Sequence, residues 1–143
     1  MSDETFNEIQ TWYLFFEPRD RVRHWWHWVL KKDFSHCYVA RETTDGRTFA
    51  ISAMKWGIAT TFVDCGITDY IMHHMERCSA VIGFTVNYTK KEGFKLRGLI
   101  TCVTLTKAIL AVEDYAITPY QLYDMLCRRY ETTVIKPYML YPE

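Results

Sequence analysis

The sequence predicts an α+β fold in which an antiparallel sheet of about five strands packs beside helices. Three observations indicate this class: short β-branched and aromatic runs, other segments with apolar residues at helical spacing, and an Asp-Gly turn within residues 43–47. A tight turn joins antiparallel strands, and helices that follow such a meander cover the sheet. With 143 residues, the chain is expected to form one domain over residues 1–143.

The first half of the chain supplies most of the expected strands. Residues 11–16 are β-branched and aromatic, end before Pro18, and are apolar enough for a strand that is buried on both faces. From residue 19 to about 31, apolar residues recur at helical spacing and predict a helix. An antiparallel meander is expected next, with strands over residues 35–41, 48–54 and 58–63.

The second half alternates helices with one strong strand. We expect a short helix over residues 69–77, a strand over 79–88 and a helix from 102 to about 112. Thr118-Pro119 combines an N-cap residue with proline at the first helical position, so it predicts the start of a last helix. Residues 132–143 contain two X-Pro pairs and predict an extended C-terminal tail.

Composition narrows the class of protein. Seventeen basic residues balance seventeen acidic ones, so net charge gives no reason to expect a specific nucleic-acid partner. The five cysteines are an odd number without a CxxC pair, which fits no disulfide framework and favours a reducing, cytoplasmic site of synthesis. No apolar run approaches the length of a membrane span, and the acidic N-terminus lacks a signal core.

Histidines raise the question of a metal site. His24 and His27 are three residues apart on an expected helix, while His73 and His74 are adjacent and point in different directions. Neither pair has a nearby acidic or cysteine residue that completes a ligand set, so zinc chemistry is the least favoured hypothesis. We expect no metal and no cofactor.

The candidate for chemistry is Cys102, at the start of an expected helix. Thr101 is a good N-cap, which places Cys102 in the first turn, where the helix dipole and free N–H groups favour a thiolate. A cysteine nucleophile also needs a histidine within reach and a group that orients the imidazole. His36, on the expected strand over residues 35–41, is the candidate base. The alternative is a small buried cysteine and an ordinary hydrogen-bonded histidine.

Three segments carry a resemblance to a known family: Arg21–Trp28, Phe34–Val39 and Leu99–Ala108. They resemble small bacterial and phage proteins related to the NlpC-like peptidases, and among papain-like enzymes they look like circularly permuted members. In such members a strand histidine precedes a cysteine at a helix start. The resemblance covers roughly residues 12–129 and implies a permuted papain-like arrangement.

By matching position, the resemblance makes Cys102 the nucleophile and His36 the general base. The third, polar member is expected on the next strand, where this sequence has Ser52 in place of an acidic or amide residue. Asp64 and Asn87 are the alternative orienting residues. The resemblance implies hydrolysis of an amide bond, with a peptidoglycan peptide or similar peptide as substrate. Acyl transfer is compatible with the same residues.

A second hypothesis places the same scaffold in a phage particle. Ser52 orients an imidazole less strongly than a carboxylate or amide, and the aromatic-rich helix and extended tail could dock on a neighbouring protein. The protein would then be a catalytically weak or inactive virion structural component of the neck or tail, with other virion proteins as partners. A virion-associated hydrolase would satisfy both hypotheses.

Overall fold

The computed structural model describes residues 9–18, 34–54, 57–88 and 101–138. The helix expected over residues 19–31 lies outside this part of the chain. In chain order the elements are β1 (Ile9–Glu17), β2 (His36–Glu42), β3 (Thr48–Met54), β4 (Gly57–Val63), α1 (Ile67–His74), the short 3₁₀ helix η2 (Met75–Arg77), β5 (Ala80–Asn87), α2 (Cys102–Leu110), α3 (Pro119–Arg129) and β6 (Thr133–Lys136).

All six described strands form one antiparallel sheet in the order β4-β3-β2-β1-β5-β6. The α+β class is therefore confirmed, but the strand count exceeds the expected five. The additional strand is β6, within the segment that was expected to be only an extended tail. Its short β-branched run pairs with β5, where Val134 lies opposite Ile82. Four residues are too few to show strand periodicity in the sequence.

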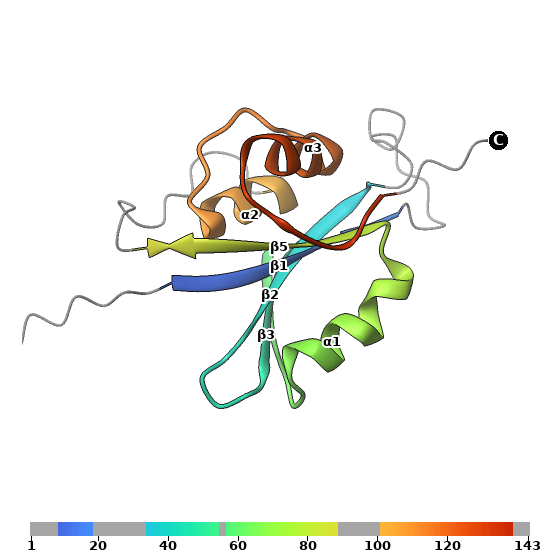
Figure 1. The fold of residues 1–143 in the computed structure, drawn as a ribbon, viewed down its shortest axis with the longest axis vertical. Coiled ribbons are helices and arrows are strands. Elements are labelled where there is room, and N and C mark those ends of the chain that lie inside the picture. Colours follow the sequence, from blue (N-terminus) through green and yellow to red (C-terminus); the bar gives the residue numbers. More distant parts are fainter. Residues whose placement is uncertain (1–8, 19–33, 55–56, 89–100, 139–143) are drawn as a thin grey trace, which may run out of the picture.

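Helices cover both faces of the sheet (Figure 1), with α2 and α3 on one side and α1 on the other. The near-continuous apolar run of β1 follows from this arrangement. Leu14 and Phe16 point into the core beneath α2 and α3, while Phe15 points into the core beneath α1, and all three are fully buried. The expectation that this strand is buried on both faces is confirmed.

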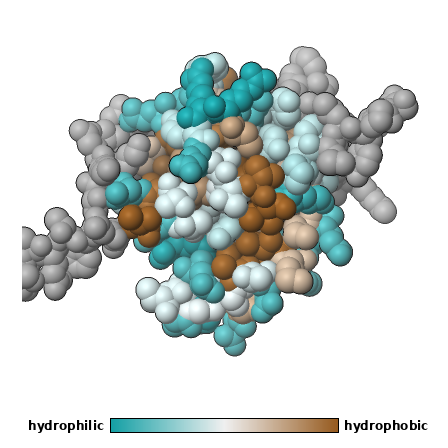
Figure 2. Space-filling view, in the orientation of Figure 1, coloured by the Kyte–Doolittle hydropathy of each residue, from teal (hydrophilic) through white to brown (hydrophobic). Residues whose placement is uncertain are grey.

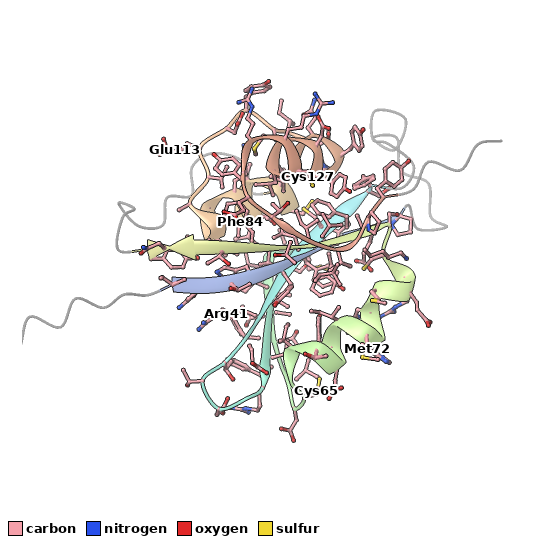
Figure 3. All side chains as sticks on the ribbon, viewed as in Figure 1. Arg41, Cys65, Met72, Phe84, Glu113 and Cys127 are labelled. Carbon is pink, nitrogen blue, oxygen red and sulfur yellow. The ribbon has the colours of Figure 1, made fainter. Side chains whose placement is uncertain are left out.

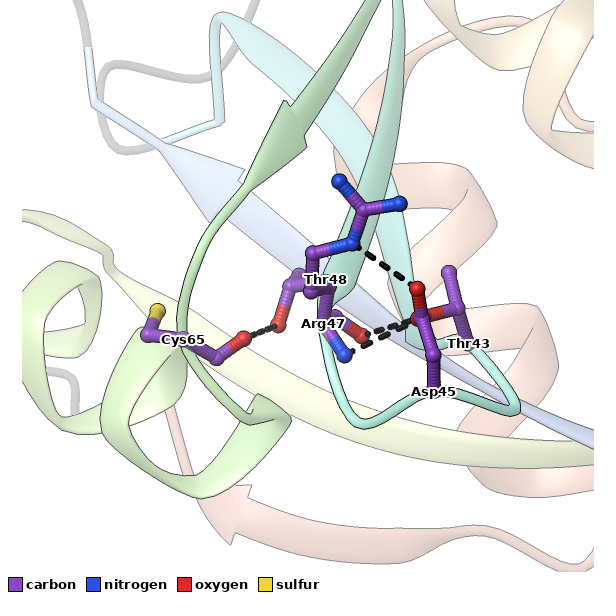
Figure 4. A network of polar contacts seen from close by, with 5 residues as sticks. All are labelled: Thr43, Asp45, Arg47, Thr48 and Cys65. Carbon is purple, nitrogen blue, oxygen red and sulfur yellow. Dashed lines mark hydrogen bonds and ion pairs between the residues drawn. The ribbon is translucent and has the colours of Figure 1, made fainter.

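The hairpin between β2 and β3 follows its turn chemistry. Gly46 has a φ of +84°, the positive value that an Asp-Gly turn requires. The Arg47 Nε donates to Asp45 Oδ2 at 3.0 Å, and the buried Thr48 hydroxyl donates to the Cys65 carbonyl oxygen at 2.9 Å. These contacts (Figure 4) fix the turn and tie β3 to the segment before α1.

Two lysines hold backbone carbonyls at places where the chain changes direction. The Lys107 ammonium donates to two carbonyl oxygens of the α2–α3 connection, both at 2.8 Å. The Lys136 ammonium, on β6, donates to carbonyl oxygens at both ends of η2, at 3.0 and 2.7 Å. The Met75 carbonyl oxygen also accepts the Cys78 N–H at 3.2 Å, so Lys136 adds a second donor there. Both lysines therefore have a structural role, because they fix backbone carbonyls in the α2–α3 connection and at the ends of η2.

The surface carries separate apolar patches with hydrophilic surface between them (Figure 2). On the edge strand β4, Phe62 is 59% exposed; it packs on Phe49 at 4.8 Å between ring centroids and lies beneath the Arg47 guanidinium. None of the helices described here has the length and apolar character that crossing a membrane requires.

Candidate active site

The start of α2 is fixed by a reciprocal capping box. Thr101 has an extended backbone, and its side chain accepts the Thr104 N–H at 3.1 Å, while the Thr104 hydroxyl accepts the Thr101 N–H at 2.7 Å. Cys102 is therefore the first residue of the helix, as the sequence predicted. The buried Val103 and Leu105 that follow anchor the helix in the core. The position of the sulfur is thus set by both a cap and a packed face.

The helix start meets the sheet where β2 and β3 separate. α2 contacts both strands, and the β2–β3 ladder ends at the Val39–Ile51 pair, before it reaches the beginning of β2. His36 and Cys37 therefore lie beyond the part of β2 that pairs with β3, although both still pair with β1, opposite Glu17 and Phe16. Although their side chains leave the strand in opposite directions, both interact with the Cys102 sulfur, and so does the Cys37 backbone N–H.

His36 is oriented by the residue that the resemblance assigned as third member. Its Nε2 lies 2.9 Å from Ser52 Oγ, and its ring stacks near the Tyr38 ring, with 6.2 Å between centroids. Because Nε2 is engaged by serine, Nδ1 is the nitrogen left to interact with the Cys102 sulfur. The structure thus brings Cys102, His36 and Ser52 together in the predicted order of contacts.

The two alternative orienting residues lie elsewhere. Asp64 follows Val63, which is four pairs along the β3–β4 ladder from the level of Ser52. Asn87 pairs with Ile9, at the opposite end of the sheet from His36. At about 3.3 Å per residue, Asp64 is about 16 Å along the strands from the level of Ser52. On the same basis, Asn87 is about 26 Å along the strands from the level of His36. Neither residue is at the imidazole.

Electrostatics favour a thiolate at Cys102. A hydrogen bond from the Cys37 thiol, together with the hydrogen bond and positive charge of His36, lowers the pKa of Cys102 from 9.0 to about 5 despite its burial. Burial acts to lower the pKa of His36, but the Cys102 sulfur and the Glu17 carboxylate outweigh it and raise that pKa above 6.5. The two shifts together describe a thiolate–imidazolium pair near neutral pH.

Cys37 is the residue that sequence reasoning missed. Strand alternation puts its side chain on the opposite face of β2 from His36, so the sequence gives no reason to place it at the site. It is fully buried among core residues, and its sulfur lies 3.7 Å from Thr106 Oγ1, one turn along α2 from Cys102. Its pKa is raised well above 9.0 by its hydrogen bond to Cys102 and by burial. The feature that identifies Cys37 is its position in the fold: it lies on the face of β2 that α2 covers, and α2 begins at Cys102.

The remaining cysteines are separate from this site. Cys65 and Cys127 lie at opposite ends of the molecule (Figure 3), and all five cysteines are free thiols. Cys78 is buried in the core beneath α1, and burial raises its pKa to about 11. Cys102 is the cysteine whose pKa is shown lowered.

The histidines considered for a metal divide into two sets. His24 and His27 lie outside the described residues. His74 packs on the Tyr70 ring, with 4.1 Å between centroids, and its Nδ1 lies 2.9 Å from an Arg77 nitrogen. Within the described part of the chain, no group of three histidine, cysteine or acidic residues is arranged to hold a metal ion.

No protein-family model, curated protein or solved structure matches this chain. The candidate site therefore stands on its geometry and electrostatics.

Proposed function

We propose that this protein is a cysteine hydrolase that acts on an amide bond, with a peptidoglycan peptide or a similar peptide as substrate. The observation that carries the proposal is the lowered pKa of Cys102 beside His36, whose Nε2 lies against Ser52. A thiolate, a histidine and an orienting group are the parts that nucleophilic catalysis by cysteine requires. A strand histidine that precedes a helix-start cysteine also supports a permuted papain-like arrangement.

Each residue then has a defined chemical role. The Cys102 thiolate attacks the carbonyl carbon of the amide, and the His36 imidazolium protonates the departing amine as the C–N bond breaks. A thioester remains on Cys102. Neutral His36 next removes a proton from water, which attacks the thioester carbonyl; the carboxylic acid leaves and the thiolate is regenerated. Ser52 holds the imidazole in the orientation that both steps need.

The first turn of α2 supplies donors for the developing oxyanion. The capping box uses the Thr104 N–H, and the Leu105 N–H donates to the Thr101 carbonyl oxygen at 3.0 Å. The N–H groups of Cys102 and Val103 precede these and point toward the helix start. Backbone donors at such a position stabilise negative charge on a carbonyl oxygen as the tetrahedral intermediate forms.

Alkylation by iodoacetamide tests the thiolate directly. At about pH 6.5, peptide mass spectrometry should find Cys102 modified first, although Cys127 is the more exposed residue. The Cys127 thiol is partly desolvated, which raises its pKa and leaves it protonated at this pH. His36→Ala should slow the labelling of Cys102 and leave Cys127 unchanged. Equal rates at the two cysteines in the unmodified protein would overturn the proposal.

Activity is tested on purified peptidoglycan by the release of free amino groups. Cys102→Ala should abolish release, and Ser52→Ala should reduce it about tenfold, the equivalent of one hydrogen bond of about 1.4 kcal/mol. Ser52→Asn restores an amide at this position and should retain more activity than Ser52→Ala. Amine release that survives Cys102→Ala would exclude Cys102 as the nucleophile.

The second candidate function is a phage virion component with weak or no activity. The observation that favours it concerns Ser52. The Ser52 hydroxyl also lies 3.5 Å from Met54 Sδ, so its hydrogen bonding is shared between that sulfur and the His36 imidazole. Quantitative mass spectrometry of purified particles tests this candidate. A fixed number of copies per particle supports it, and absence from particles excludes it.

A further inference from the structure

Cys37 lies directly beside the candidate nucleophile and takes no part in the mechanism described above. It follows His36 in the sequence, and its side chain is fully buried between the sheet and α2. Its sulfur lies 3.7 Å from Thr106 Oγ1, on the turn of α2 that follows Cys102. The Cys37 S–H is thus enclosed against α2, beside Thr106 and Cys102.

The protons at this point can be counted. The Thr106 hydroxyl has one proton, which it donates to the Cys102 carbonyl oxygen at 2.7 Å. It therefore has no second proton for the Cys37 sulfur, and toward that sulfur it acts as an acceptor. The Cys37 S–H has two acceptors within the described residues: the Thr106 oxygen and the Cys102 sulfur. A charged acceptor forms the stronger hydrogen bond, so a Cys102 thiolate takes this proton in preference.

The two thiols differ in what their surroundings permit. Neighbouring thiolates repel each other, so only one of the pair can ionise at neutral pH. Cys102 has the imidazole and the first turn of a helix beside it, whereas Cys37 is enclosed in the core. Burial and the Cys102 hydrogen bond raise the pKa of Cys37, which keeps its proton available as a donor.

We propose that Cys37 is a positioning residue of this site, whose buried S–H donates to the Cys102 sulfur and stabilises it as a thiolate beside His36. This inference rests on the proposed function, because it takes Cys102 as the nucleophile. Formation of the thioester removes the charge from the Cys102 sulfur, and the Cys37 S–H then turns to Thr106. When the thioester is hydrolysed and the thiolate reforms, the S–H returns to it.

The pH dependence of Cys102 alkylation separates this role from simple packing. The full chain is treated with iodoacetamide across about pH 4 to 9, and the rate at Cys102 is followed by peptide mass spectrometry. Cys37→Ala removes the donor and should move the midpoint upward by about one pH unit, so that the rate at the original midpoint falls about fivefold. Cys37→Ser keeps a donor in nearly the same volume and should restore the low midpoint.

Cys78→Ala is the matched control, because it also removes a buried thiol but from the core on the other face of the sheet. It should leave the midpoint unchanged. An unchanged midpoint in Cys37→Ala, with a low midpoint in the unmodified protein, overturns the role of Cys37 alone. A midpoint near 9.0 in the unmodified protein overturns the proposed function as well.

A spectroscopic measurement decides the case in which Cys37→Ala does not fold. The Raman S–H stretching band of Cys37 is compared between the unmodified protein and Cys102→Ala. A thiolate acceptor lowers the stretching frequency, so the band should move to higher frequency when the Cys102 sulfur is removed. A band that does not move excludes a hydrogen bond from Cys37 to Cys102.

Discussion

The coupled titration of Cys102 and His36 should give the protein a defined acid dependence of stability. In the folded state the pKa of Cys102 is lowered from 9.0 to about 5, and the pKa of His36 is raised above 6.5. The lowered thiol contributes stability that is complete above pH 9.0 and is lost as pH falls through about 5. The raised imidazole contributes stability that is complete below pH 6.5 and is lost as pH rises through its folded value.

The magnitude follows from the protons that each state binds. Between pH 6.5 and 5 the unfolded chain binds a proton at both groups, whereas the folded pair binds only one. That interval of about 1.5 pH units, at about 1.4 kcal/mol per unit, corresponds to about 2 kcal/mol of unfolding free energy lost on acidification. Just above pH 6.5 both states bind one proton at the pair, so this contribution is flat.

Urea unfolding at several pH values between about 5 and 7 measures this effect. The unmodified protein is compared with the double variant Cys102→Ser/His36→Gln, and the difference in unfolding free energy should shrink by about 2 kcal/mol between pH 6.5 and 5. Cys78→Ser is the control, because that thiol has a raised pKa and does not titrate in this range. A difference that stays constant or grows toward pH 5 would refute the thiolate–imidazolium pair.

Two further predictions concern the elements that hold the site and the sheet. Thr101→Ala removes the N-cap of α2 and should cost about 1 kcal/mol in urea unfolding, as should the equivalent cap removal Thr118→Ala at α3. Only Thr101→Ala should also change the alkylation rate of Cys102, and equal rates in the two variants would contradict control by the helix start. Lys136→Met leaves two carbonyl oxygens without their ammonium partner and should cost about 1 to 3 kcal/mol, whereas Arg128→Ala, at an exposed ion pair, should change stability by less than about 0.5 kcal/mol. A similar small change in both of these variants would show that the part-buried contacts of Lys136 contribute no more than an exposed ion pair.

Local sequence signals predicted the elements that their own residues determine. Asp45-Gly46 marked the hairpin, Thr118-Pro119 marked the start of α3, and Thr101 placed Cys102 in the first turn of α2. In each case the signal and the structure that it specifies lie within a few residues of each other. Such local chemistry can be read without knowing what the segment packs against.

The order of strands and the contacts of Cys37 depend on distant parts of the chain. No local pattern in Thr133–Lys136 indicates that it pairs with β5, because pairing depends on which edge is left open when the sheet is assembled. Strand periodicity gave Cys37 its correct face but not its neighbour. The end of the β2–β3 ladder at Val39–Ile51 lets one sulfur reach residues on both sides of a strand. Strand alternation alone separates His36 from Cys37, and the sequence does not show where the ladder ends.

The central position of β1 has a consequence for synthesis of the protein on the ribosome. Its two neighbours are β2, which carries His36, and β5, which immediately precedes the segment leading to Cys102. β1, the first of the described strands, therefore cannot complete its pairing until the chain has been translated through β5, and α2 emerges later still. Until then Cys102 is an ordinary thiol with neither its cap nor its imidazole. A nascent chain thus emerges without an activated nucleophile, and the reactivity of Cys102 appears only after α2 has packed on the sheet beside His36.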